Sequence, residues 1–87
     1  MDAAEAAWTR ASRRVFALLR EAGLSGKDQR EDRLNLYRWF FQDNTIASTT
    51  DLSTEALRNF ADTLDYWKRE RRLHEEAHRY AKPTFDG

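Results

Sequence analysis

The stretch that decides the fold is "LSTEALRNFADTLDYWKRERRLHEEAHRYA", Leu52 to Ala81, because nothing within it is typical of a helix end. Ser53 is the expected N-cap, and Leu52 and Leu57 flank it at the spacing of a hydrophobic staple. The next helix-breaking residue is Pro83. The sequence therefore predicts one helix over about 53–81, roughly 42 Å long at 1.5 Å per residue.

The apolar residues change sides along this predicted helix. One face carries Leu57, Phe60, Leu64 and Trp67. The roughly opposite face carries Tyr66, Leu73, Ala77 and Tyr80. Either the chain bends near residue 68, or the last three turns bury a different face against something else. A domain of this length has a radius of gyration of about 12 Å, so an unbent helix overhangs the body.

Two further helices are predicted upstream, over about 3–22 and 27–41. Asp2 is the expected cap of the first, and Gly23 is expected to end it. Ser25 and Asp28 are alternative caps of the second, and the sequence does not decide between them. We therefore predict an all-α protein, a three-helix bundle with a long, overhanging C-terminal helix, in one domain over residues 1–87.

The composition excludes several classes of protein. The 15 basic and 15 acidic residues balance, which argues against binding nucleic acid or membranes through bulk charge alone. The chain has no cysteine, which fits a reducing compartment. Neither a signal peptide nor an apolar run of membrane-spanning length is recognised. We predict a cytoplasmic protein that does not bind membranes.

The segment "HEEAH" contains a His-Glu-x-x-His pattern, formed by His74, Glu75 and His78. On a helix, such a pair of histidines shares a face and can bind zinc, with the glutamate as general base. A zinc protease also needs a third ligand, and Asp86 is the only downstream residue that could supply one. We therefore expect no metal site, no cofactor, no small-molecule substrate and no enzymatic activity.

Basic residues form two groups that could contact phosphates. Four lie on one side of the first predicted helix, and four lie in "KRERR": Arg10, Arg13, Arg14, Arg20, Lys68, Arg69, Arg71 and Arg72. The alternative is a solvated face, which the zero net charge favours. The aromatic run 39–41 could stack on bases, but its helical spacing is more typical of a core.

The row formed by Tyr66, Leu73, Ala77 and Tyr80 is the predicted partner-binding surface. A spaced apolar row on a projecting helix suits a partner helix, and the simplest partner is a second copy of the chain. The alternative is that the first helix covers this row within one chain. The main prediction is a non-enzymatic protein that acts through protein–protein interaction. The alternative is a DNA-binding or recombination accessory protein that uses its arginines.

Three segments, "FALLREAGL", "DQREDRLNLYRWF" and "TIASTTDLSTEALRNFADTLD", cover residues 16–65 and resemble small helical modules of phage and prophage proteins of high-GC bacteria. Such modules are similar to segments appended to phage single-strand annealing proteins. The matching residues are Gly23, Arg30, Arg33, Leu34, Ser48, Asp51, Leu52 and Leu64. The sequence departs at "FFQDN", where the modules have a glycine. The resemblance implies a phage context and DNA metabolism, and carries over no catalytic residue.

Overall fold

The computed structural model describes residues 2–83 as an entirely helical body without strands. The α-helices are α1 (Ala3–Glu21), α2 (Arg30–Phe41), α3 (Thr54–Arg69) and α4 (Leu73–Tyr80). Two short 3-10 turns, Lys27–Gln29 and Thr49–Asp51, precede α2 and α3. The prediction of an all-α protein is confirmed, although the described residues contain four α-helices where three were expected.

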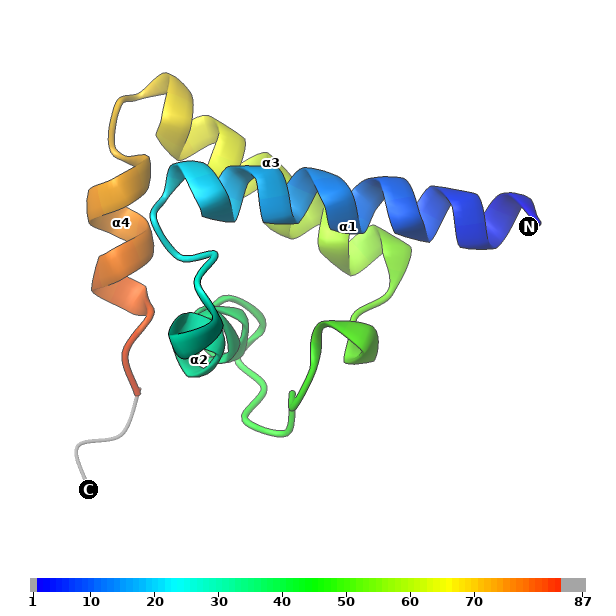
Figure 1. Cartoon of the computed structure of the whole chain (residues 1–87), viewed down its shortest axis with the longest axis horizontal. Helices are drawn as coiled ribbons and strands as arrows, with labels where there is room; N and C mark the ends of the chain where they lie inside the picture. The colour runs from blue at the N-terminus through cyan, green and yellow to red at the C-terminus, as the bar shows by residue number, and fades with distance from the viewer. Residues whose placement is uncertain (1, 84–87) are drawn as a thin grey trace.

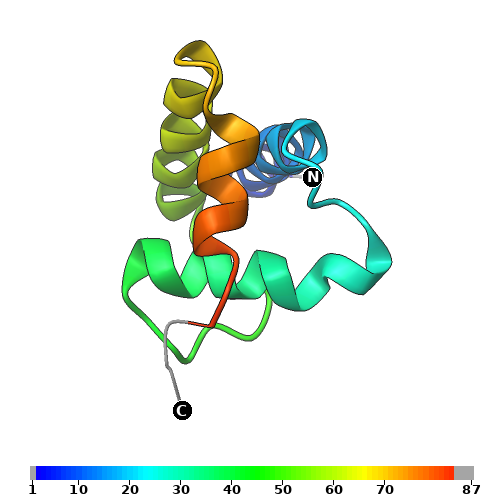
Figure 2. The same ribbon diagram turned by 90° about the vertical axis from the view of Figure 1, so that its left-hand side faces the viewer.

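Helices α1 and α3 pack along each other, and α2 lies on the opposite side of the core (Figure 1). Figure 2 shows α4 standing across one end of this arrangement, beside α3 and with its C-terminal end reaching α2. The body measures 42 × 30 × 23 Å and has a radius of gyration of 12.7 Å. The core contains the fully buried side chains of Tyr37, Phe60, Leu19, Leu24, Leu36, Leu57, Leu64 and Val15.

The predicted caps of α1 and α3 are confirmed. Asp2 Oδ1 accepts a hydrogen bond of 2.8 Å from the Glu5 N–H, and Ser53 Oγ accepts one of 3.1 Å from the Ala56 N–H. Neither Ser25 nor Asp28, the two caps that the sequence left open, caps the second helix. Instead, the Gly26 N–H donates to Gln29 Oε1 at 2.9 Å, which closes the turn before α2.

The prediction of one overhanging helix over 53–81 is wrong. Helix α3 ends at Arg69, Arg71 takes a left-handed conformation with φ +59°, and α4 starts at Leu73. The chain turns back there, so that α4 packs against α2 and α3. The change of apolar face near residue 68 reflects this turn, which was the first of the two alternatives that the pattern left open.

Aromatic side chains from α2 meet those of α3 and α4. Trp39 stacks on Tyr80 with ring centroids 3.7 Å apart and lies 6.1 Å from Trp67. Phe40 packs edge-on against Phe60 at 5.2 Å. The aromatic run 39–41 is therefore half-buried packing against the core, in agreement with its helical spacing.

Candidate functional surfaces

The two histidines of α4 fasten this helix to the end of α1. His78 Nε2 lies 2.7 Å from the carbonyl oxygen of Ala22, and the His74 ring stacks on the His78 ring at 4.1 Å. Because a carbonyl only accepts, His78 Nε2 must donate this hydrogen bond. His78 Nε2 is therefore engaged in holding two helices together and is not free to bind a metal.

Metal binding would require more ligands than this pair. Among residues 2–83, no group of three or more His, Cys, Asp or Glu side chains is arranged to hold a metal ion. Asp86, the third ligand considered from the sequence, lies outside the described residues. The His-Glu-x-x-His pattern thus has a structural explanation in the contact between α4 and α1.

The predicted partner-binding row does not form one surface. Leu73 is 7% exposed and Ala77 is fully buried, because α4 folds back onto the body. Tyr80 is half-buried on the ring of Trp39. Only Tyr66 points outward, with 46% exposure. Intramolecular burial, the alternative left open, therefore holds for Leu73, Ala77 and Tyr80, and the helices that pack most closely against α4 are α2 and α3.

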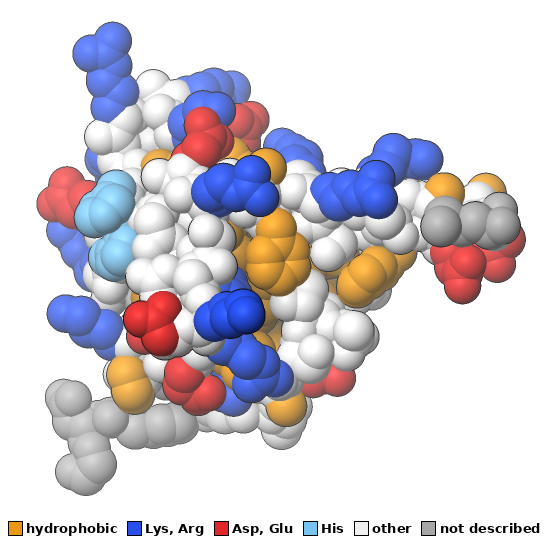
Figure 3. Space-filling model, viewed as in Figure 1, with side chains coloured by type: hydrophobic (Ala, Val, Ile, Leu, Met, Phe, Trp, Pro, Cys, Tyr) orange, Lys and Arg blue, Asp and Glu red, His pale blue; other side chains and the backbone are white. Residues whose placement is uncertain are grey.

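The arginines predicted on α1 divide into paired and unpaired residues. Arg14 forms an ion pair with Asp62 at 3.0 Å and lies 3.8 Å from Asp65, so it links α1 to α3. Arg10, Arg13 and Arg20 are exposed and form no ion pair within the described residues. Figure 3 shows Lys and Arg side chains along α1 and around the turn from α3 to α4.

The second predicted basic group surrounds the turn between α3 and α4. Lys68 is paired with Glu21 at 3.0 Å. Arg69, Arg71 and Arg72 are exposed and have no carboxylate partner in the part of the chain that the structure describes. The Arg72 guanidinium lies 5.8 Å from the centre of the Tyr66 ring. We call Tyr66, Arg69, Arg71 and Arg72 the α3–α4 corner.

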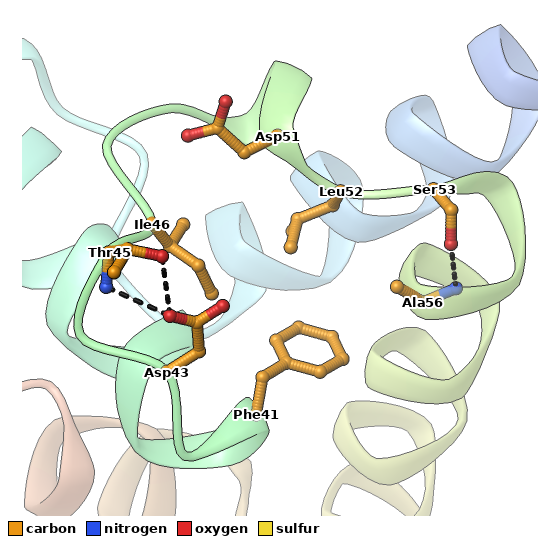
Figure 4. A pocket seen from close by; sticks show the side chains of 8 residues that line it. All are labelled: Phe41, Asp43, Thr45, Ile46, Asp51, Leu52, Ser53 and Ala56. Carbon is orange, nitrogen blue, oxygen red and sulfur yellow. Dashed lines mark hydrogen bonds between the residues drawn. The ribbon is translucent and has the colours of Figure 1, made fainter.

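A hollow of about 460 Å³ opens between the end of α2 and the start of α3 (Figure 4). Its walls are apolar and its rim is acidic, and the lining comprises Phe41, Asp43, Thr45, Ile46, Asp51, Leu52, Ser53 and Ala56. Asp43 Oδ1 accepts hydrogen bonds from the Thr45 hydroxyl at 2.6 Å and the Thr45 N–H at 2.9 Å. Both bonds lower the pKa of the Asp43 carboxyl, and the bond from the Thr45 hydroxyl has the larger effect. The rim therefore stays negative.

A smaller hollow of about 120 Å³ lies where α1 and α2 meet the residues before the second 3-10 turn. It is lined by Phe16, Arg30, Arg33, Leu34, Tyr37, Ser48 and Thr49. The sequence singled out Arg30 and Arg33 through the phage-module resemblance, and did not predict that they meet Ser48. Two arginines one helical turn apart, followed by a hydroxyl-rich loop, are the signal that could have suggested it.

No protein-family model, curated protein or solved structure matches this chain. The resemblance to phage-protein modules therefore stays a prediction. The helices within residues 2–83 include none with the length and apolar character that crossing a membrane requires.

Proposed function

We propose that this protein is a non-enzymatic nucleic-acid-binding protein that contacts a single strand through the α3–α4 corner. The observation that carries the proposal is the position of Tyr66. Among residues 2–83 it is the one large hydrophobic side chain that is exposed, and the Arg72 guanidinium lies 5.8 Å from the centre of its ring. Within the same residues, neither Arg72 nor the nearby Arg69 and Arg71 have a carboxylate partner. Aromatic rings stack on bases of any sequence, while arginines contact the phosphates beside them.

The charge distribution supports a phosphate-bearing partner over an apolar protein surface. Protein interfaces are depleted of charge at their centre, whereas the corner presents one aromatic ring among Arg69, Arg71 and Arg72. The zero net charge of the chain does not argue against a phosphate-bearing partner. Arginines such as Arg14 and Arg38 are neutralised by carboxylates outside the corner, and the local charge of the corner stays positive. A DNA-binding role also agrees with the context that the phage resemblance implies.

The backbone of Arg71 supports the proposal independently. A left-handed conformation costs a non-glycine residue about 1–2 kcal/mol, and glycine is the usual residue at such a helix end. Arg71 keeps φ +59° where glycine is usual, and its long cationic side chain is exposed at the corner. Backbone strain of this kind is concentrated at functional sites.

The test is binding of fluorescent single- and double-stranded oligonucleotides of one sequence, measured by anisotropy over a series of salt concentrations. Wild type should prefer the single strand, and affinity should fall with salt by a slope of about 0.7 per phosphate contacted. Tyr66→Ala should weaken binding by about 1–3 kcal/mol. Arg69→Gln and Arg72→Gln should each reduce the salt slope.

The matched control is Arg58→Gln, which removes from α3, outside the corner, an exposed arginine that forms no ion pair within residues 2–83. It should change affinity much less than Arg72→Gln does. Absence of binding at low salt, or equal effects of Arg58→Gln and Arg72→Gln, would rule out the corner as a nucleic-acid surface.

A second candidate function, protein–protein interaction, is supported by the hollow in Figure 4. Its apolar walls and acidic rim, with Asp43 and Asp51, suit a partner segment that places an apolar side chain next to a Lys or Arg. Ala56→Arg would fill the hollow, and Asn59→Arg makes the same change of charge on an exposed position. Affinity capture with mass spectrometry should then find a protein that only Ala56→Arg fails to retain.

A further inference from the structure

The 120 Å³ hollow between α1, α2 and the Ser48–Thr49 segment presents hydrogen-bond donors, and no carboxylate from the described part of the chain lines it. Its two cations, Arg30 and Arg33, form no ion pair within residues 2–83. Asp51 is the acidic residue closest in sequence to Ser48 and Thr49, and it does not line the hollow. Its carboxylate accepts from the N–H groups of Ala47 and Ser48, at 2.9 and 3.1 Å.

Backbone carbonyls hold both guanidinium groups in place. Arg33 Nη1 donates to the carbonyl oxygens of Leu24 at 2.8 Å and Gly26 at 2.7 Å, and Arg30 Nη2 donates to that of Ala47 at 2.8 Å. A guanidinium has five N–H donors. Each arginine therefore keeps donors beyond those used to position it, and Nε and Nη2 of Arg33 have no partner within the described residues.

The hydroxyl groups of the hollow also have hydrogens to donate. Ser48 Oγ accepts from the N–H and the hydroxyl of Thr50, at 3.3 and 3.0 Å, which leaves its own hydrogen free. The Tyr37 and Thr49 hydroxyls lie 3.0 Å apart, so one donates to the other and one hydrogen remains. Burial raises the pKa of the Tyr37 phenol, and the hydroxyl therefore stays protonated at neutral pH.

Phe16 and Leu34 complete the hollow with apolar walls. The Arg33 guanidinium lies 5.8 Å from the centre of the Phe16 ring, which supports its position from the α1 side. Two fixed cations and two hydroxyl donors beside an apolar wall form a surface that favours an oxyanion, because charge-assisted hydrogen bonds are strongest where water is partly excluded.

We propose that this hollow is a binding site for one phosphate group, held by Arg30 and Arg33 with hydrogen bonds from Ser48 and the Tyr37–Thr49 hydroxyl pair. Its volume of about 120 Å³ leaves room for a tetrahedral group with four oxygens. The site takes inorganic phosphate or the phosphate of a nucleic acid, since both offer the same oxygens. It is separate from the α3–α4 corner and does not depend on the function proposed for that surface.

The experiment is a titration of the isotope-labelled protein with sodium phosphate, followed by NMR. Saturable shifts are expected at the backbone amides of Ser48 and Thr49 and at the Nε–H groups of Arg30 and Arg33. Sodium chloride at the same ionic strength is the control and should not reproduce them. Shifts that rise without saturating, or that chloride reproduces, would overturn the proposal.

Two variants test the geometry. Arg30→Gln removes an exposed cation that makes a single hydrogen bond, and should weaken phosphate binding about tenfold. Thr49→Val removes a hydroxyl with no change of charge and should weaken binding by a smaller factor. The control Arg58→Gln removes the same charge from α3. Equal phosphate affinities of Arg30→Gln and Arg58→Gln, with both folded by circular dichroism, would show that the hollow is not the site.

The source of the phosphate is then distinguished with two oligonucleotides of one sequence, with and without a 5′ phosphate. A terminal phosphate gives Arg30-dependent shifts with the phosphorylated strand only, and a backbone phosphate gives them with both. Shifts with inorganic phosphate alone assign the site to the free ion. Tyr66→Ala should leave all phosphate shifts unchanged, which separates failure of this site from failure of the α3–α4 corner.

Discussion

Helices α1 and α3 end with the same pattern of backbone hydrogen bonds but with different residues at the decisive position. At the end of α1, the Gly23 N–H donates to the Arg20 carbonyl at 3.0 Å and the Leu24 N–H to the Leu19 carbonyl at 2.9 Å. This is the Schellman arrangement, in which the residue after the cap is left-handed. Glycine takes that conformation without strain, and Gly23 has φ +77°.

At the end of α3, the Arg71 N–H donates to the Lys68 carbonyl at 3.0 Å and the Arg72 N–H to the Trp67 carbonyl at 2.8 Å. The geometry matches the end of α1, but the left-handed residue is an arginine. Helix α2 repeats the departure, since Gln42 has φ +51°. Gln42 falls in "FFQDN", where the sequence departs from the predicted phage-module pattern, which has a glycine.

The difference shows that one helix end is encoded locally and the other depends on the rest of the fold. Local conformational energy opposes the turn at Arg71 by about 1–2 kcal/mol. Burial of Leu73, Ala77 and Ala81, with Tyr80 on Trp39, offsets this cost, because these side chains leave water only if the chain turns.

The largest effect is expected for Ala77→Glu, because it disrupts the burial of α4 that stabilises the turn after α3. A carboxylate at a fully buried position, with no space and no partner, should cost about 3 kcal/mol or more. Denaturant unfolding measures the loss. Glu75→Ala, on the exposed side of the same helix, is the control. If the Ala77→Glu variant stays folded and changes only its oligomeric state in sedimentation, Ala77 lies in an interface with a partner.

Gly23→Ala is expected to have the next largest effect, because it places a side chain on a residue with a left-handed backbone at the end of α1. The added Cβ would lie 3.5 Å from the His74 and His78 rings, which is ordinary contact. The cost therefore comes from the left-handed backbone and should be about 1–2 kcal/mol. A loss of stability below the error of a urea titration would contradict the account of this turn.

His78→Gln should destabilise the protein by about 1 kcal/mol, because it disturbs the hydrogen bond that joins α4 to the Ala22 carbonyl. His74→Gln is the matched control, since that ring stacks on His78 and makes no hydrogen bond within the described residues. Thermal unfolding of both variants measures the difference. Equal losses would mean that ring stacking, and not the bond to α1, holds α4 in place.

Arg71→Gly should have the smallest effect on folding and the opposite sign. It relieves the left-handed strain but adds freedom to the unfolded chain, for a net gain of about 0.5–1 kcal/mol. It should also weaken binding to a single strand, because the corner loses a cation. Gln42→Gly relieves similar strain without changing charge and should leave binding unaffected. A loss of stability in Arg71→Gly would show that the arginine side chain supports the turn.

The sequence predicted those parts of the fold whose causes lie within a few residues. The cap at Ser53 and the end of α1 at Gly23 were predicted correctly, because a hydroxyl and a glycine act on their immediate neighbours. The break after Arg69 was not predicted as a helix end, because neither glycine nor proline marks it. The shift of the apolar face near residue 68 was its only trace.

The candidate sites were predicted less completely. The arginines at 69, 71 and 72 were identified from their clustering, and the structure adds that Tyr66 lies beside them. The phosphate-sized hollow was not predicted, because it joins α2 to a loop segment whose path depends on packing. Arg30 and Arg33 are one turn apart on a helix, but their alignment with Ser48 follows from bonds to the carbonyls of Ala47, Leu24 and Gly26.

By itself, the sequence determined that the chain is helical, where α1 begins and ends, and where α3 begins, since periodicity, capping and glycine conformation are local properties. Only the tertiary structure decided that the last predicted helix divides at Arg71 and that α4 returns to the core. The physical reason is that the left-handed conformation of an arginine is locally unfavourable, and the apolar burial that outweighs it is available only against α2 and α3.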